Sequence, residues 1–482
     1  MHQLLGAGEA AVVTRVCELL VPGSAAARPD RYLAAALPAL DAGEEDAVRA
    51  AIGVMAGVSD AAELARLAGS AAFDRFRRLA IEAGYGDHAP PGRRGPDGAD
   101  VLVVGRGGTQ LAADLAGRGA DVLLLDSVPA PARFAAAGDD VTLAAEPEPV
   151  AAERAPETFL AGLSPWYDHV EARLGPPDGP PPRDRRVEPG FTALGTGLRP
   201  LRTWSPRPDP GGARLRTRCA VRHVVLDTAG RRPRVTGVAY TRDGGDGELR
   251  APVVVLAAGP LDTPRILLRT WENAGLDTPS GRLVGRGVGL RPARYVYGRF
   301  AEEGDCRTGA CWQGGEVTVE ATVRPEPVAF AQGLVDARHR PLWGAGLAGA
   351  VRAYGRWSGL RVLVTDDNTA VADLGVGGEV VVGKRFSAAE RRKLATALEF
   401  AVAVLRAAGA REVVWSGLSA AHPQGGAPMG DDPARSVTGP DGRCHDVDGL
   451  YVGDGSLLPA VLPVRPALTV LALAAKVAGA IR

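Results

Sequence analysis

The chain has 482 residues, 46% of them hydrophobic, and its 56 lysine and arginine residues balance 56 aspartate and glutamate residues. This length and apolar content suffice for two or three hydrophobic cores, so we expect a globular protein of several domains. A formal net charge of zero argues against nucleic acid or an anionic membrane surface as a partner. The sequence also contains no run of 18 apolar residues, so we expect no membrane span.

The cysteine content predicts a reducing compartment. Five cysteines are an odd and sparse set in so long a chain, which favours free thiols and a cytoplasmic location over a disulfide framework. Neither the cysteines nor the histidines show the spacing of a metal site, so we expect no bound metal.

Residues 1–96 are predicted to form a separate helical module. An apolar face repeats with helical periodicity between Ala10 and Leu20, where Pro22 ends the helix. Acidic residues interrupt this stretch and no basic segment precedes it, which argues against a signal peptide. Further helices are predicted at residues 30–40, 44–55 and 61–82.

A nucleotide-binding βαβ unit is predicted next. Val101–Val104 is a continuous apolar run of the kind found in parallel strands, and a helix is predicted from Leu111 to Arg118, before a second strand at 121–125. Gly105, Gly107 and Gly108 lie in the turn, where missing side chains let a pyrophosphate approach the helix N-terminus. Asp126 follows 21 residues after Gly105, as expected of an acid that binds ribose hydroxyls. Gln110 occupies the place of the third glycine, where helix and strand should pack closely.

More of the same domain is predicted far along the chain. Residues 214–225 and 235–240 have the pattern of paired strands. Val253–Leu256 is another buried strand, which ends in Ala257, Ala258 and Gly259 before a helix. Small residues at a strand end let backbone approach a ligand without intervening side chains.

Residues 271–421 are predicted to form a substrate domain. Alternating stretches at 316–323, 360–365 and 379–383 favour antiparallel strands. Ser387 and Glu390 have the spacing of a capping box, and an amphipathic helix should run from there to residue 408. Arg291 precedes a proline in this domain, and the sequence assigns it no function.

The last sixty residues carry the densest motif. His422 opens the sequence HPQGG, and a buried strand is predicted at Leu450–Val452. A polar turn, Asp454-Gly455-Ser456, follows the strand, and an alanine-rich helix is predicted at residues 467–481.

These motifs together resemble the glucose–methanol–choline (GMC) oxidoreductases, which are FAD enzymes that oxidise alcohols. The resemblance covers most of residues 100–482 and is densest at both ends of that range. It implies an α/β fold with a Rossmann-like FAD-binding domain and a discontinuous antiparallel-sheet substrate domain, preceded by the N-terminal helical module. We predict domain boundaries at 1–96, 97–270, 271–421 and 422–482, the last segment returning to the FAD-binding domain.

The resemblance also implies roles for single residues. His422 would face the flavin as the catalytic base, and imidazole suits this role because it titrates close to neutral pH. The backbone at Asp454 and Gly455 would lie near the pyrophosphate and ring, and the region of Val221 would contact adenine through its main chain. The predicted catalytic residues are His422 and Arg465, and the predicted cofactor-binding residues are Gly105, Gly107, Gly108, Asp126, Val221, Ala258, Gly259, Asp454, Gly455 and Pro466.

The module at 1–96 resembles the N-terminal segment of long-chain-alcohol-type GMC proteins and the small subunit of gluconate dehydrogenases. That resemblance implies packing on the flavoprotein core or binding of a protein partner. The remaining expected partner is a small-molecule substrate.

The sequence departs from the family at the flavin ring. Residues 127–163 replace a long glycine-rich flavin loop with 37 residues, and the whole chain contains only two asparagines, Asn273 and Asn368, so the family's asparagines near the ring are missing. Arg465 stands where the family has Asn or His. A guanidinium stays protonated, so Arg465 cannot be a base. It could instead hold an alkoxide or a substrate carboxylate, or stabilise an enolate.

Three hypotheses remain open. The first is an FAD-dependent alcohol oxidoreductase. The second keeps the scaffold but uses His422 and Arg465 for acid–base chemistry without flavin redox, with FAD absent or structural. The third is a non-catalytic homologue that binds a partner through residues 1–96. Under both catalytic hypotheses we expect His422 and Arg465 to point into one cavity between the dinucleotide sheet and the sheet of 271–421.

Overall fold

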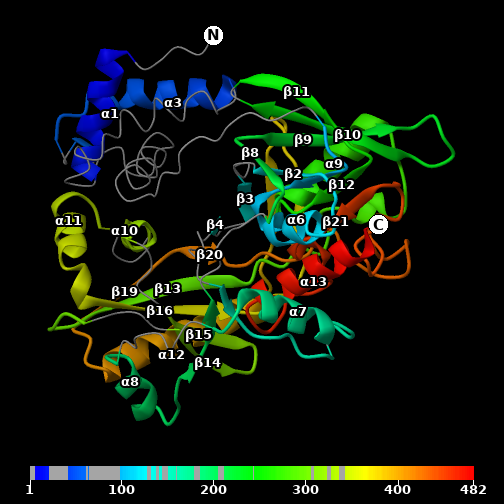
Figure 1. Cartoon of the computed structure of the whole chain (residues 1–482). Helices are drawn as coiled ribbons and strands as arrows, with labels where there is room; N and C mark the ends of the chain where they lie inside the picture. The colour runs from blue at the N-terminus through cyan, green and yellow to red at the C-terminus, as the bar shows by residue number, and fades with distance from the viewer. Residues whose placement is uncertain are drawn as a thin grey trace.

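A computed structural model of the chain describes residues 6–20, 42–60, 63–64, 98–126, 132–136, 141–143, 150–158, 160–177, 185–204, 211–242, 244–304, 309–322, 327–335 and 342–481. Two large sheets organise these residues, one parallel with five strands and one mainly antiparallel with eight (Figure 1). The predicted α/β fold class is confirmed.

The parallel sheet gathers strands from distant parts of the sequence. Its order is β21–β12–β1–β2–β8, and each neighbouring pair is parallel. The strands predicted at 101–104, 121–125, 253–256 and 450–452, which the sequence assigns to one nucleotide-binding domain, are thus consecutive in one sheet. The strands are β1 (Val101–Val104), β2 (Val122–Asp126), β8 (Arg214–Thr217), β12 (Val253–Leu256) and β21 (Leu450–Val452).

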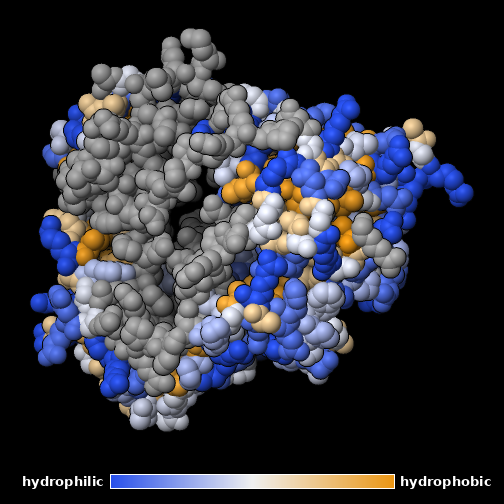
Figure 2. Space-filling view, viewed as in Figure 1, coloured by the Kyte–Doolittle hydropathy of each residue, from blue (hydrophilic) through white to orange (hydrophobic). Residues whose placement is uncertain are grey.

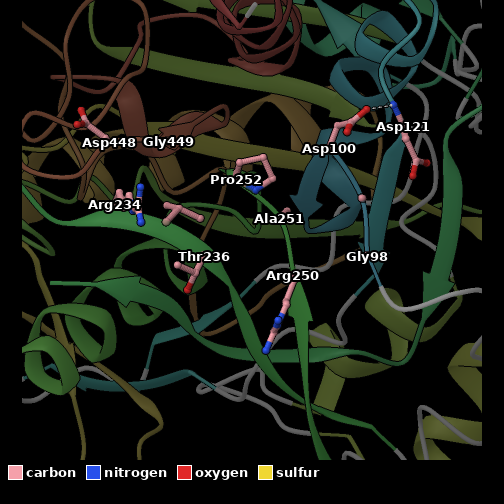
Figure 3. A pocket seen from close by; sticks show the side chains of 12 residues that line it. Gly98, Asp100, Asp121, Arg234, Thr236, Arg250, Ala251, Pro252, Asp448 and Gly449 are labelled. Carbon is pink, nitrogen blue, oxygen red and sulfur yellow. Dashed lines mark hydrogen bonds between the residues drawn. The ribbon is translucent and has the colours of Figure 1, made fainter. Parts of the chain in front are cut away.

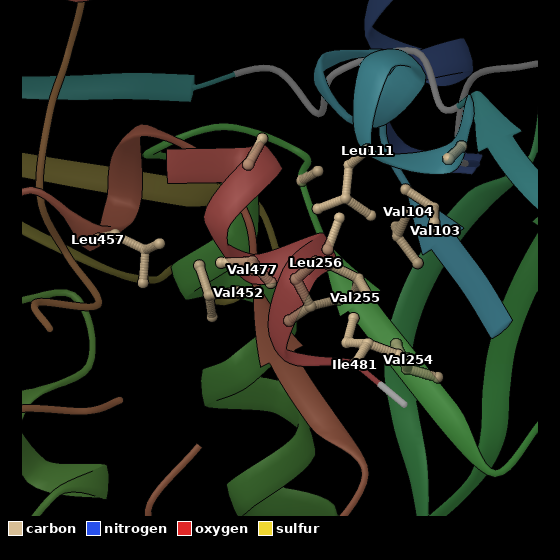
Figure 4. Packing of buried hydrophobic residues seen from close by; sticks show 14 of the residues in the cluster. Val103, Val104, Leu111, Val254, Val255, Leu256, Val452, Leu457, Val477 and Ile481 are labelled. Atoms are coloured by element: carbon tan, nitrogen blue, oxygen red, sulfur yellow. The ribbon is translucent and has the colours of Figure 1, made fainter. Parts of the chain in front are cut away.

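Apolar side chains on both faces hold this sheet in the interior. Helices α6 (Thr109–Ala116) and α13 (Ala467–Ala480) lie together against it, so Leu111 and Val477 meet the strand residues Val255 and Val452 (Figure 4). All four of these side chains are at most 1% exposed. Continuous Val and Leu runs are typical of strands covered on both faces, which explains why these strands could be predicted.

The predicted strand at 214–225 is two strands, which corrects that interpretation. Arg218 has a left-handed φ of 61°, and this turns the chain between β8 and β9 (Ala220–Asp227). Strand β8 joins the parallel sheet beside β2, whereas β9 forms a three-stranded antiparallel sheet with β10 (Arg234–Arg242) and β11 (Gly245–Arg250). Helix α9 (Asp262–Ala274) packs on β9 and follows β12.

The eight-stranded sheet forms the second layer. Its order is β4–β20–β13–β16–β15–β14–β6, and β19 also pairs with β13. The predicted antiparallel strands at 316–323 and 360–365 are confirmed as β15 and β16. The strands are β4 (Val141–Leu143), β6 (Arg199–Pro200), β13 (Pro292–Arg299), β14 (Gly309–Gly314), β15 (Val317–Thr322), β16 (Trp357–Val364), β19 (Glu412–Trp415) and β20 (Leu418–Ala420).

Helix α12 (Ala388–Ala407) covers one face of this sheet, together with α8 (Glu188–Ala193). The capping box predicted at its start is confirmed, because Glu390 N donates to Ser387 Oγ and Ser387 N donates to Glu390 Oε2. Its buried side chains, among them Leu394 and Val404, pack on Val296, Leu360 and other residues of the sheet.

Two smaller sheets complete the strand pairing. In one, β18 (Val380–Lys384) pairs with β17 (Val371–Leu374), as predicted, and also with β3 (Ala132–Ala136). In the other, β5 (Val150–Ala152) pairs with β7 (Arg202–Trp204). Strands β3, β4 and β6 come from the interval 97–270, so this interval contributes to the sheets of 271–421. Helix α7 (Ser164–Leu174) packs against α13.

The N-terminal helices α1 (Ala7–Leu20) and α3 (Ala42–Met55) pack on each other, and α1 also contacts α11 (Gly344–Arg352) (Figure 1). Val13, Val16 and Ile52 share a hydrophobic cluster with Tyr297 of β13 and Phe330 of α10 (Pro327–Val335), next to α11. The apolar face predicted for the first helix is thus buried. The helices predicted at 30–40 and 61–82 lie outside the described residues, apart from residues 63 and 64.

Large hydrophobic side chains are scattered over the described surface. On the face shown in Figure 2, the right-hand rim is largely hydrophilic. The exposed large hydrophobic residues belong to separate elements: Val54, Leu194, Leu215, Trp343 and Val376. None of the helices in the described ranges combines the length and apolar character needed to cross a bilayer.

Candidate active site

Four predicted motifs meet where the parallel strands end. We call this place the dinucleotide edge: the carboxyl ends of β1, β2, β12 and β21, with the turns that follow them. Because the strands are parallel and in register, their carboxyl ends lie at the same end of the sheet. Gly105, Asp126, Ala257 and Gly453 all lie at this end. Ligands of doubly wound folds bind outside this end of the strands.

Close backbone packing requires the three glycines of the first turn. At Gly105 φ is 104°, and an added Cβ would overlap the Ala257 carbonyl oxygen and come within 2.5 Å of Ala258 Cα. An added Cβ would lie 2.9 Å from the Ala257 oxygen at Gly107 and 2.9 Å from Ala257 Cβ at Gly108. Gly108 therefore makes the tight helix–strand contact that the sequence analysis assigned to the position of Gln110.

Gln110 instead belongs to a polar contact between α6 and α7. Its amide lies beside Asp114 and Arg173, and Arg173 forms an ion pair with the buried Asp114. The larger side chain is accommodated because it turns towards α7 and away from the strand. The missing third glycine therefore does not disturb the turn.

Asp126 and Val221 lie next to each other at the dinucleotide edge. Asp126 is the last residue of β2 and is half-buried, and its carbonyl accepts a hydrogen bond from Cys219 N at 3.1 Å. Val221 is buried in β9, and its carbonyl accepts from Arg265 Nη2 at 3.0 Å. The protein itself thus uses the Val221 carbonyl, whereas Asp126 lies at the carboxyl end of β2, and its predicted contact with ribose stays a prediction.

Asp454 connects the C-terminal turn to β12 and α9. Its carboxylate accepts from Gly259 N at 2.8 Å, from Thr263 Oγ1 at 2.6 Å and from Ser456 N at 2.7 Å. Burial raises the pKa of this carboxyl, although the donated hydrogen bonds oppose the rise. The side chain is fully used inside the protein, so only backbone near Asp454 and Gly455 can face a ligand.

The HPQGG segment runs beside this turn. Gly425 N donates to Gly455 O at 2.9 Å and Ala427 N donates to Ser456 O at 3.0 Å. Gly425 and Gly426 both have left-handed φ values, and a Cβ at Gly426 would lie 2.7 Å from Pro264 Cγ. These contacts bring His422 to the dinucleotide edge. Pro466, the remaining predicted cofactor residue, is buried at the start of α13.

Two residues that are not glycine adopt left-handed conformations beside each other. His422 has φ 51° and Arg291 has φ 46°, and Ala421 N donates to the carbonyls of Leu290 and Arg291. Such conformations cost about 1–3 kcal/mol each and cluster at functional sites. Gln424 holds the turn, because its side chain donates to His422 O at 3.3 Å and accepts from Leu462 N at 2.9 Å.

His422 and Arg465 belong to one set of charged side chains, which we call the charged network: Glu320, Arg361, Arg465 and His422. Arg465 donates to both oxygens of Glu320, from Nε at 2.6 Å and from Nη2 at 2.7 Å. Arg361 also binds Glu320, with Nε 2.8 Å from Oε2, and its Nη2 lies 3.3 Å from His422 Nε2. The predicted catalytic pair is thus connected through two residues that the sequence analysis did not single out.

Electrostatics favour an ionised Glu320. Its side chain is 1% exposed, and burial alone would raise the pKa of the carboxyl. The guanidiniums of Arg361, Arg465 and Arg291 hold the pKa well below its usual range instead. Arg291 is 1% exposed and donates from Nη1 to Val464 O at 3.0 Å, so this residue, to which the sequence assigned no function, anchors the segment before Arg465.

Strand register places the charged network on one face of the eight-stranded sheet. Cys311 pairs with Glu320, Glu320 with Arg361, and Arg361 with Tyr295, so these four residues form a row across four strands. The other face carries the apolar residues that contact α12. A charged residue within an otherwise apolar strand, as in VTVEAT and WSGLRVLV, was the signal that could have revealed Glu320 and Arg361.

A groove of about 790 Å³ lies at the opposite ends of the parallel strands. Asp100, Asp121, Arg234 and Asp448 are among its lining residues (Figure 3). The amino ends of β1 and β2 reach this groove, so it is distinct from the dinucleotide edge. Arg234 and Arg250 also line the groove, and Asp121 and Asp448 form ion pairs with arginines, so the groove has mixed charge.

Comparison with known proteins shows which class of protein the chain resembles. Sequence models described as GMC oxidoreductase match residues 201–291 and 378–474. Over these two segments the chain is similar to the GMC oxidoreductases. The matched segments include Val221, the strand ending in Gly259, His422 and the turn at Asp454.

An uncharacterized GMC-type oxidoreductase of Mycobacterium tuberculosis is 29% identical over 313 residues, which cover 57% of this chain and 46% of that protein. Long-chain-alcohol oxidase FAO4B of Arabidopsis thaliana is 27% identical over 310 residues, which cover 52% of this chain and 39% of that protein. The chain thus spans less than half the length of these relatives. Pyridoxine 4-oxidase from Mesorbium loti shares the fold, with a TM-score of 0.55 at 16% identity over 79% of this chain and 99% of that chain.

Proposed function

We propose that the protein is an FAD-dependent oxidoreductase of the GMC type that oxidises an alcohol of a small molecule, with His422 as the base. The observation that carries the proposal is the convergence of His422 with four nucleotide-binding motifs at the dinucleotide edge. The strands of these motifs come from residues 101–452, and they meet in one parallel sheet. The matches to the GMC family models and the alcohol-oxidising relatives support the same reaction class.

The residues at the dinucleotide edge fit the adenine dinucleotide half of FAD. Gly105 and Gly107 leave two positions without side chains in the turn before the N-terminus of α6, which suits a pyrophosphate. Asp126 can accept hydrogen bonds from ribose hydroxyls, and the open backbone at Gly259 has no atom within 4 Å of an added Cβ. When bound, FAD would supply the two-electron acceptor that alcohol oxidation needs.

His422 is positioned to accept a hydroxyl proton at Nε2. Arginine can only donate, so the hydrogen bond from Arg361 requires a lone pair on His422 Nε2. At 3.3 Å this bond is long, and a substrate hydroxyl can replace it. The proton would then move to Nε2 as the carbon loses its hydride, while the strained turn and Gln424 hold the imidazole in place.

The visible spectrum of the purified protein tests the proposal, because bound oxidised flavin is yellow. We expect a flavoprotein, and we expect His422→Ala to keep the flavin while alcohol oxidation falls by about 10²–10⁴-fold. His445→Ala is the matched control, because His445 pairs with Ser436 outside the charged network. A colourless protein whose unfolding temperature does not respond to FAD would contradict the proposal.

Arg465 keeps one alternative open, a GMC scaffold that performs acid–base chemistry without flavin redox. Arg465 stands where the family has Asn or His, and its fixed positive charge could stabilise an anion without a flavin. Arg465→Asn separates the two functions. In an oxidase this variant should keep or improve the oxidation of neutral alcohols, whereas in a non-redox enzyme it should abolish activity.

A further inference from the structure

We propose that the substrate carries a carboxylate, which the free edge of Arg465 binds while His422 receives the hydroxyl proton. The substrate class is therefore a hydroxy acid. This inference rests on the proposed function for the fate of the hydroxyl group, but the anion site can be tested without turnover.

The geometry of the Arg465 guanidinium leaves one edge for a ligand. Glu320 occupies Nε and Nη2, which form the lateral edge of the group. Within the described part of the chain, Nη1 makes no hydrogen bond, and the end edge of Nη1 and Nη2 still offers two parallel N–H groups. This fork matches the two oxygens of a planar carboxylate.

Arg465 combines partial access with a fixed position. Its side chain is 17% exposed, in contrast to 3% for Arg361 and 1% for Glu320. Three contacts fix the backbone before it: Arg291 with Val464 O, Asn368 with Val461 N and Gln424 with Leu462 N. A group that is ordered before binding loses little conformational freedom when an anion arrives.

The charges around Arg465 favour an anion over a cation or a neutral group. Glu320 shares its single negative charge between Arg361 and Arg465, so these three groups together carry one positive charge. Burial raises the pKa of the neighbouring Cys311 thiol, and Glu320 adds to the rise, whereas positive charge from Arg199, Arg465 and Arg291 opposes it. A substrate carboxylate would thus meet a positive potential beside His422.

The experiment compares benzoate with its neutral analogue benzamide by isothermal titration calorimetry on the full chain. We expect benzoate to bind at least about tenfold more tightly, because a bidentate guanidinium–carboxylate pair is a strong interaction. Arg465→Gln should remove this preference. Arg465→Lys should retain only part of it, because an ammonium lacks the planar fork.

Arg222→Gln is the matched control. Arg222 is a surface arginine paired with Asp246, so its loss should leave the preference unchanged. Thermal unfolding verifies that each variant is folded, and Arg465→Lys keeps a cation beside Glu320 if the glutamine variant is unstable. Equal binding of benzoate and benzamide, or a preference that survives in Arg465→Gln, overturns the proposal. Tighter binding of inorganic phosphate than of benzoate overturns the carboxylate assignment.

The two proposals fail in different ways. A colourless protein that binds benzoate through Arg465 would keep the anion site and reject the oxidoreductase. A yellow protein that oxidises neutral alcohols but shows no carboxylate preference would keep the oxidoreductase and reject the anion site.

Discussion

Asp454 at the dinucleotide edge and Glu320 in the charged network are both buried carboxylates, yet their pKa values are shifted in opposite directions. Neutral donors surround Asp454, and its pKa is raised by burial. Guanidiniums surround Glu320, and its pKa is lowered despite burial. Hydrogen bonds from neutral groups do not offset the desolvation of a carboxylate here, whereas two full positive charges do.

The comparison extends to how each region is built. Missing side chains define the dinucleotide edge, because Gly105 and its neighbours permit backbone contacts that a Cβ would prevent. Long charged side chains define the network, and their positions depend on strand register. Substitutions should therefore act through sterics in the first region and through electrostatics in the second.

The largest effect is expected for Glu320→Gln, which leaves buried guanidiniums without their carboxylate. We expect a loss of about 3–5 kcal/mol in the free energy of unfolding at neutral pH, measured by urea denaturation. Because the folded-state pKa of Glu320 is lowered, its contribution is complete above about pH 4.3 and declines as pH falls further. The wild-type advantage should shrink on acidification.

Glu316→Gln is the control for that change. Glu316 precedes β15 near Glu320 but is 61% exposed, and it pairs with Lys393 at the surface. We expect a loss below about 1 kcal/mol. Similar losses for the two glutamates would contradict the electrostatic interpretation of the network.

Gly105→Ala should be next in size, because it combines backbone strain with overlap against Ala257 and Ala258. We expect about 2–5 kcal/mol of destabilisation. Gly119→Ala isolates the strain, since Gly119 has a similar φ of 92° but open space around an added Cβ. The two variants should differ in chemical denaturation, and equal midpoints would show that close packing at Gly105 is unimportant.

Asp126→Ala should weaken FAD binding by about 1–3 kcal/mol, because a ribose hydroxyl would lose its acceptor. Flavin fluorescence during titration with FAD measures the affinity. Asp121→Ala is the control, because Asp121 lies before β2, at the end opposite to Asp126, and contacts Arg214 there. Its replacement should leave FAD affinity unchanged. If both variants bind FAD equally well, the ribose does not lie at Asp126.

The smallest effect is expected from the titration of Asp454, and its sign is opposite to that of Glu320. A raised pKa means that the folded protein holds the proton more tightly, so this contribution is present at acid pH and is lost as pH rises through the folded-state pKa. Asp454→Asn removes that pH dependence, on the order of 1 kcal/mol. Unfolding curves between pH 3 and neutrality should show the difference in slope, and parallel curves would refute it.

The dinucleotide edge could be predicted from sequence because its determinants are local. Val101–Val104 and Leu450–Val452 are apolar runs beside glycine turns, so both their burial and their ends are visible in a few consecutive residues. The break at Arg218 was missed because only its left-handed backbone separates two segments that the sequence pattern joins into one. Gly108 was not given its packing role because the motif spacing pointed to Gln110 instead.

The charged network could be predicted only in part. His422 and Arg465 belong to recognisable motifs, but Glu320 and Arg361 lie in strands whose register no local pattern fixes. Their partnership depends on the row of paired residues that crosses β14, β15, β16 and β13. This row brings together residues that are far apart in sequence, such as Tyr295 and Arg361, which are separated by 66 positions. Long-range strand pairing is the physical reason that the partnership of Glu320 and Arg361 could not be predicted, although each charge is visible within its own strand.

The order of strands in the parallel sheet also has a consequence for biosynthesis. Strand β12 pairs with β1 on one side and waits for β21 on the other, and about 190 residues separate β12 from β21. At ribosomal speeds of about 5–20 residues per second, roughly 10–40 seconds pass between the emergence of these two strands. During that interval β12 presents an open hydrogen-bonding edge, which is the kind of surface that recruits chaperones or other nascent chains.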